Sequence, residues 1–169
     1  MFASLLEEAI ESWEGARHGA IAELRNIPAD QYGYRPVPEV RSVAEQAAHI
    51  LEVAQLMVGE LYAPDTNLKR LPWPELLRHH AVDVMDLREK DQLLDALEST
   101  LETGVARFRE VGEIHMLQTI ERFDGARGTR LAWFYHGIAQ EEYHRAQITV
   151  YARMLGIVPA LTQVILGSP

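Results

Sequence analysis

Apolar side chains recur at every third or fourth position through most of the chain, which is the spacing of helices that bury one face. This spacing predicts four long helices, over residues 2–24, 43–61, 91–111 and 130–155. Three prolines and a glycine fall within residues 26–41 and exclude a regular element there. The first two predicted helices are therefore separate elements joined by a loop.

The predicted helix ends carry the residues that usually cap helices. Ser42 is followed three positions later by Glu45, and this pair predicts a capping box at the start of the second helix. Thr129 suits the position just before the fourth helix. Gly156 suits the position just after that helix, and Pro159 prevents its continuation.

Two long connections separate the last three predicted helices. Residues 71–89 predict a short helix within a long connection, and residues 112–128 predict an irregular or extended one. Because strands and helices do not alternate, the pattern predicts an all-α fold, a four-helix bundle that forms a single domain over residues 1–169. Long connections favour a crossover topology over simple up-and-down hairpins.

Composition narrows the possible functions. The net charge of −9 disfavours binding to nucleic acid, because such a surface repels phosphate. The chain has no cysteine, which excludes disulfides and thiolate metal sites and fits a reducing cytoplasm. No apolar run approaches about 18 residues, and the amino-terminal segment lacks the basic region of a secretory signal. We therefore expect a cytoplasmic protein that crosses no membrane.

The fourth predicted helix carries an unusual set of polar residues. A helical projection places His136, Gln140 and Tyr143 on the inward side, with His144 at its edge. The same projection places Glu141 toward solvent. Inward polar groups need partners, because each unsatisfied group costs about 1–3 kcal/mol.

The second helix offers one such partner, since His49 lies at the border of its apolar stripe. Histidines at these places are compatible with hydrogen-bonded core or boundary residues. They are also compatible with a metal site, because imidazole nitrogen binds zinc, nickel, copper or iron and bundles build metal sites from facing helices. Spacing alone leaves both interpretations open.

Two segments resemble a known superfamily. The segment "YHRAQITVYARMLGIVP" resembles the end of the last bundle helix of the DinB-like, YfiT-like superfamily, and "IPADQYGYRPVPEVRSVAEQAAHILE" resembles its first loop and second helix. The resemblance implies a four-helix bundle, often a homodimer, with a divalent metal held by one residue of the second helix and two of the last. Carried over, these ligands are His49, Gln140 and His144, and the ion is zinc, nickel, iron or manganese.

Gln140 departs from the superfamily pattern, because most members have histidine there. A glutamine oxygen is a neutral and weak ligand, so the departure predicts loose binding, a water in that place, or loss of the ion. His136 is the second-ranked candidate to replace Gln140 as a ligand. A helix sets the Cα atoms of His136 and His144 about 12 Å apart, so an ion shared by the two side chains would be strained.

The resemblance implies a metal-dependent enzyme that acts on a small molecule, either a hydrolase or a thiol-dependent transferase or isomerase. A low-molecular-weight thiol is then an expected partner, and no catalytic residue is identified. The alternative is a non-catalytic dimeric bundle with a weakened metal site, which serves as a binding or stress-response module.

Overall fold

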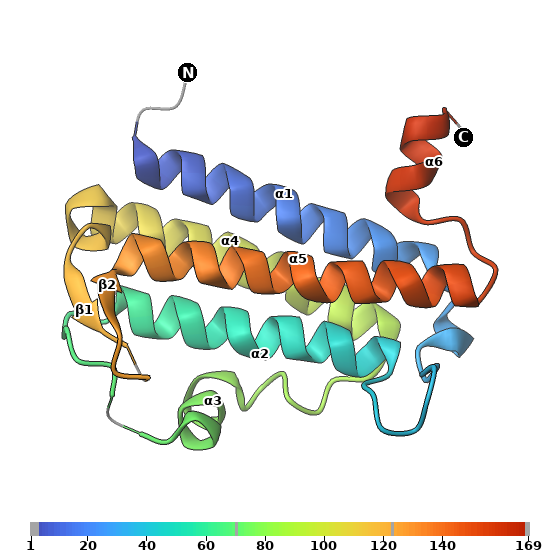
Figure 1. Ribbon diagram of the computed structural model, residues 1–169, viewed down its shortest axis with the longest axis horizontal. Helices are drawn as coiled ribbons and strands as arrows, with labels where there is room; N and C mark the ends of the chain where they lie inside the picture. The colour runs from blue at the N-terminus through green and yellow to red at the C-terminus, as the bar shows by residue number, and fades with distance from the viewer. Residues whose placement is uncertain (1–3, 70, 123, 168–169) are drawn as a thin grey trace.

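Four long helices form the body of the protein in the computed structural model, which describes residues 4–69, 71–122 and 124–167 (Figure 1). They are α1 (Leu5–Asn26), α2 (Val43–Tyr62), α4 (Lys90–Met116) and α5 (Arg130–Met154). Both α1 and α2 pack against α4 and α5, so α1 and α2 lie diagonally across the bundle. The predicted all-α four-helix bundle is confirmed. Residues 2 and 3, which the sequence assigns to the first helix, lie outside the described residues.

The connection between α2 and α4 contains the short helix α3 (Trp73–Ala81), as the sequence predicts. Figure 1 shows this connection returning to the end of the bundle where α2 begins, so α2 and α4 run in the same direction. This is the expected crossover. A 3₁₀ turn, η1 (Ala29–Gln31), lies between α1 and α2.

The connection between α4 and α5 is partly extended. It contains two short antiparallel strands, β1 (Thr119–Glu121) and β2 (Arg127–Thr129). The last helix is α6 (Ala160–Leu166), which Figure 1 shows standing away from the bundle axis. No helix in the described part of the chain is both long and apolar enough to cross a membrane.

The caps of α2 and α5 are those that the sequence predicts. The Ser42 side chain accepts a hydrogen bond from the Glu45 amide at 3.2 Å, and the Glu45 carboxylate accepts one from the Ser42 amide at 2.7 Å. Thr129 accepts from the Ala132 amide at 3.0 Å. The third predicted helix ends at residue 111 in the sequence pattern, but helical residues continue to Met116 beyond a break at Gly112, where φ is 74°.

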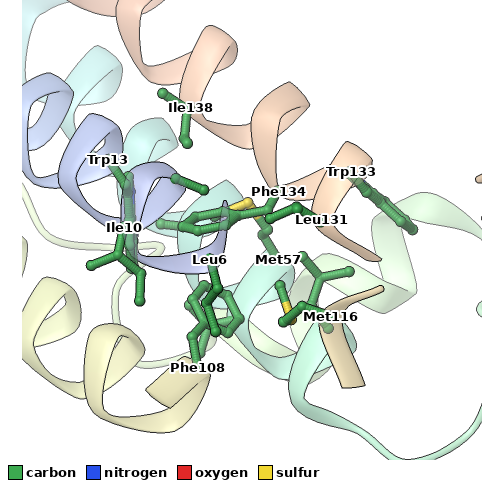
Figure 2. Close-up of a cluster of buried hydrophobic side chains, with 14 of the residues drawn as sticks. Leu6, Ile10, Trp13, Met57, Phe108, Met116, Leu131, Trp133, Phe134 and Ile138 are labelled. Atoms are coloured by element: carbon green, nitrogen blue, oxygen red, sulfur yellow. The ribbon is translucent and has the colours of Figure 1, made fainter. Parts of the chain in front are cut away.

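Two apolar clusters fill the bundle, one toward each end. Figure 2 shows the first cluster, in which Trp13 meets Phe134 edge to face with ring centroids 5.5 Å apart. The second cluster surrounds Ile50 and Leu51 of α2. Such packing of large side chains from all four helices supplies most of the stabilisation of a bundle.

A buried ion pair links α1 to α5. Arg17 donates from Nε to Glu141 Oε2 at 2.9 Å and from Nη2 to Glu141 Oε1 at 2.5 Å. Trp13 Nε1 also donates to this carboxylate, at 2.7 Å. Glu141 is only 1% exposed, so the prediction that it faces solvent is wrong. The helical projection considers one helix at a time, so it does not include Arg17 of α1, which balances the charge of Glu141 in the core.

The inward side of α5 is consequently rotated relative to the projection. His136 is exposed and Tyr143 is 64% exposed, although the projection points both inward. Phe134, Ile138 and Ile148, which the projection did not place inward, are buried. Gln140 lines a hollow with Met57 of α2, and Gln147 lines another with Gln46 of α2, so part of the projected inward side borders α2.

Candidate metal centre

Two histidines from different helices meet between α2 and α5. The imidazole rings of His49 and His144 contact each other edge to face, with centroids 4.8 Å apart and planes at 85°. The His49 side chain is 16% exposed and His144 is 5% exposed. The packing of α2 against α5 thus brings together the two histidines that the superfamily pattern places at the metal.

One nitrogen of each ring is held by an oxygen atom. His49 Nδ1 lies 3.1 Å from Glu52 Oε2, and His144 Nδ1 lies 2.7 Å from Gln46 Oε1. With the proton on Nδ1, each ring donates to its oxygen partner and keeps a lone pair on Nε2. Metal-binding histidines commonly have this arrangement, because the outer partner fixes the tautomer and the ring orientation.

A chain of polar groups supports His144. The Gln46 amide nitrogen lies 2.5 Å from Gln147 Oε1 and 3.4 Å from the Tyr151 hydroxyl, which donates to the Arg41 carbonyl at 3.1 Å. Sequence reasoning missed Gln46 as a site residue. A glutamine one turn before His49 on the apolar stripe of a helix is the signal that could have found it.

His144 stays neutral at physiological pH. Its pKa is lowered from 6.5 to about 4, chiefly by burial and also by electrostatic interaction with His49 and Arg41. A neutral imidazole is the form that coordinates a metal ion. The environment therefore holds this ring ready to act as a ligand or as a hydrogen-bond acceptor.

Gln140 and His136 lie on a different hollow. Both line a space of about 270 Å³ that neither His49 nor His144 lines. The Oε1 atom of Gln140 is buried and has no hydrogen-bond partner among the described residues. Within the same part of the chain, no three histidine, cysteine, aspartate or glutamate residues gather as a metal site. The structure thus brings together two of the three predicted ligands, His49 and His144, and places the third, Gln140, on a separate hollow.

The chain is a four-helix bundle with a crossover, and its second and last long helices carry the paired histidines. Comparison with known proteins identifies the class to which it belongs. The sequence model of the DinB family matches residues 1–166. The chain belongs to the DinB family, which confirms the resemblance found in the two sequence segments. None of the functionally curated proteins compared with the chain matches it.

Solved structures share the fold at low sequence identity. A DinB-like protein from Bacillus subtilis is 19% identical with a TM-score of 0.66, and the match covers 88% of this chain and 92% of that one. A protein assigned to the DinB family from Exiguobacterium sibiricum is 18% identical with a TM-score of 0.67, covering 92% and 95%. These likenesses establish the fold.

A third solved structure is a mutant of the mycothiol-dependent maleylpyruvate isomerase. It is 14% identical with a TM-score of 0.67 over 85% of this chain. The match covers 60% of the isomerase, so this chain spans less than two thirds of that protein. This likeness, too, is one of fold.

Proposed function

We propose that this protein is a divalent-metal-dependent enzyme acting on a small molecule, with His49 and His144 as nitrogen ligands. The observation that carries the proposal is their edge-to-face contact at 4.8 Å, with Nδ1 of each ring held by an oxygen. The two imidazole nitrogens fit zinc, nickel or iron. A bound ion supplies Lewis acidity or lowers the pKa of a coordinated water or thiol.

The protein's own residues orient the site. Gln46 and Glu52 hold the two imidazole rings in one tautomer, and Tyr151 ties Gln46 to the backbone of the first loop. Gln140, with its unpartnered oxygen, is the proposed acceptor for a water or substrate group beside the ion, in place of the usual third histidine.

Two hollows flank the histidines and give room for a small substrate. The hollow beside His49 measures about 370 Å³ and that beside His144 about 530 Å³, and both are lined by Glu39, Val40 and Arg41. These volumes lie within the usual range for small-molecule sites. Since one structural neighbour is mycothiol-dependent, we propose a low-molecular-weight thiol as the partner. The reaction is then a hydrolysis or a thiol-dependent transfer or isomerisation.

Metal analysis tests this proposal directly. We expect protein loaded with zinc or nickel to hold about one ion per chain by elemental analysis. His49→Ala and His144→Ala should each weaken binding at least about tenfold, since even outer-shell changes cost roughly 10- to 100-fold. His18→Ala, on the exposed side of α1, is the matched control and should bind normally. Native and loaded protein that both lack metal would overturn the proposal.

The second candidate function is a non-catalytic dimeric bundle with a weakened metal site. It is favoured by Gln140 and by the finding that the described residues hold no three-ligand cluster. Exposed apolar residues on α6, including Val164 at 76% and Ile165 at 73%, offer a surface for a second copy. This candidate predicts that His144→Ala leaves metal content unchanged. A large loss of bound metal in that variant would exclude it.

A further inference from the structure

Arg41 lines both of the hollows that flank the paired histidines. The hollow beside His49 measures about 370 Å³, and the hollow beside His144 about 530 Å³. Glu39 and Val40 also line both, so the segment of residues 39–41 borders the two spaces together. A ligand in either hollow would therefore lie beside this segment.

The backbone at Arg41 is held in place on two sides. Its carbonyl accepts a hydrogen bond from the Tyr151 hydroxyl of α5 at 3.1 Å. The next residue, Ser42, is the capping residue at the start of α2. The Arg41 side chain thus begins at a point that is fixed relative to α2 and α5, and so relative to His49 and His144.

The guanidinium of Arg41 acts on His144 and has no partner of its own in the described part of the chain. Burial, the His49 ring and Arg41 all lower the pKa of His144, so the charged end of Arg41 lies near that imidazole. Among the described residues, no carboxylate lies within 4 Å of this guanidinium and no oxygen atom accepts a hydrogen bond from it. A guanidinium presents its N–H donors in a planar fork that matches a carboxylate. Arg41 is therefore a fixed positive charge that is available to an anion.

Other charged side chains of these hollows already have partners. Arg35 is paired with Glu45 at 3.1 Å. Glu52 lies 3.1 Å from His49 Nδ1. Arg88 donates to two nearby backbone carbonyls at 2.9 and 2.6 Å. These contacts leave Arg41 as the better placed of the three arginines to bind a ligand.

Glu39 carries the opposing charge. It lines the same two hollows as Arg41, and in the described residues no ion pair within 4 Å joins the two side chains. Its carboxylate would repel an anion bound at Arg41 and would lower the affinity without occupying the guanidinium. Removal of the two charges should therefore change anion binding in opposite directions.

We propose that the site flanking His49 and His144 takes an anionic small-molecule substrate, and that Arg41 binds the carboxylate group of that substrate. The inference rests on the proposed function, since it names the class of substrate that the metal centre would serve. Recognition of the anion itself requires no bound ion, because the guanidinium provides it.

Benzoate and benzamide form a matched pair of probes for this proposal. They share size and shape, but only benzoate carries a negative charge at about pH 7. Titration of the isotope-labelled full chain in the presence of a chelator, followed by nuclear magnetic resonance, should show benzoate binding about three- to tenfold more tightly than benzamide. The largest shifts should fall at residues 39–41 and at His144.

Four substitutions locate the preference. Arg41→Gln should remove it and leave the affinity for benzamide within about twofold, whereas Arg41→Lys keeps the charge without the fork and should retain part of it. Glu39→Gln should raise the affinity for benzoate about two- to threefold, because a repelling carboxylate is lost. Arg78→Gln is the control, since it removes the same charge at an exposed position of α3 that lines neither hollow. It should leave the preference intact.

The proposal is overturned by equal affinities for the two probes, by binding of neither probe, or by a preference that survives Arg41→Gln. An equal loss in Arg78→Gln would show a general effect of net charge and would count equally against it. Zinc content measured on the same proteins separates this inference from the metal proposal. A chain that prefers benzoate but holds no zinc would keep the anion site and exclude the metal, and a zinc-loaded chain without the preference would do the reverse.

Discussion

Glu141 of α5 and Arg17 of α1 form a bidentate ion pair in which Arg17 is fully buried and Glu141 is 1% exposed. Arg17 also donates to the Leu97 carbonyl at 2.8 Å, so the pair links α1, α4 and α5. Removing two charges from water is costly, and the pair is tolerated because its hydrogen bonds are met on both sides.

Breaking this pair should destabilise the fold strongly. Glu141→Leu leaves a buried guanidinium without a counterion and should cost about 3–5 kcal/mol in the free energy of unfolding. Adding Arg17→Met should recover much of the loss, because no uncompensated charge remains. Urea denaturation measures both effects. Glu142→Leu, at the adjacent 47% exposed position, is the control and should cost less than about 1 kcal/mol.

Acid should destabilise the protein partly through His144. Its pKa falls from 6.5 to about 4 on folding, mainly through burial, so between these values the unfolded chain binds more protons than the folded one. The contribution is absent above pH 6.5, and stability is lost as the pH falls toward 4. The full loss is about 3 kcal/mol at about 1.4 kcal/mol per pKa unit.

Unfolding measured at several pH values in metal-free protein checks this expectation. His144→Gln cannot titrate and should show a shallower loss of stability between pH 6.5 and 4 than the unchanged chain. Identical slopes for the two proteins would show that His144 titrates normally in the folded state.

Replacing Gln140 by histidine should strengthen metal binding. The substitution provides a third imidazole four residues before His144, as the superfamily pattern has it, and nitrogen is a better ligand than an amide oxygen. We expect at least about a tenfold gain in affinity for zinc or nickel by calorimetry. Ala139→His, at the neighbouring exposed position, should give no such gain. No change in Gln140→His would place residue 140 out of reach of the ion.

Two glycines should respond oppositely to alanine. A methyl group added at Gly15 of α1 would meet no other atom within 4 Å, so Gly15→Ala should stabilise the protein by about 0.5–1 kcal/mol through helix propensity. At Gly137 an added Cβ would overlap the Met57 sulfur, where α5 approaches α2. Displacing Met57 should cost about 1–3 kcal/mol and cancel or reverse the gain. Thermal or urea unfolding of both variants would show the difference, and equal stabilisation would contradict it.

Local patterns along the chain were sufficient to predict the helices and most of their ends. The capping pair of Ser42 and Glu45 and the cap at Thr129 are set by residues within one turn, so sequence alone identifies them. The apolar spacing also determined the bundle class, because a helix with one apolar face must bury it against others. The helical residues beyond Gly112 and the short β1–β2 pairing were missed, since the signals there are weak.

The orientation of α5 was decided only in three dimensions. Glu141 has the charge of a solvent-facing residue, and nothing near it in sequence reveals that Arg17 and Trp13 surround its carboxylate. The meeting of His49 with His144, and the position of Gln140 on a separate hollow, likewise depend on how α2 packs against α5. Sequence determines what each helix can bury, whereas the contacts between helices decide which polar groups are satisfied and which remain available to a ligand.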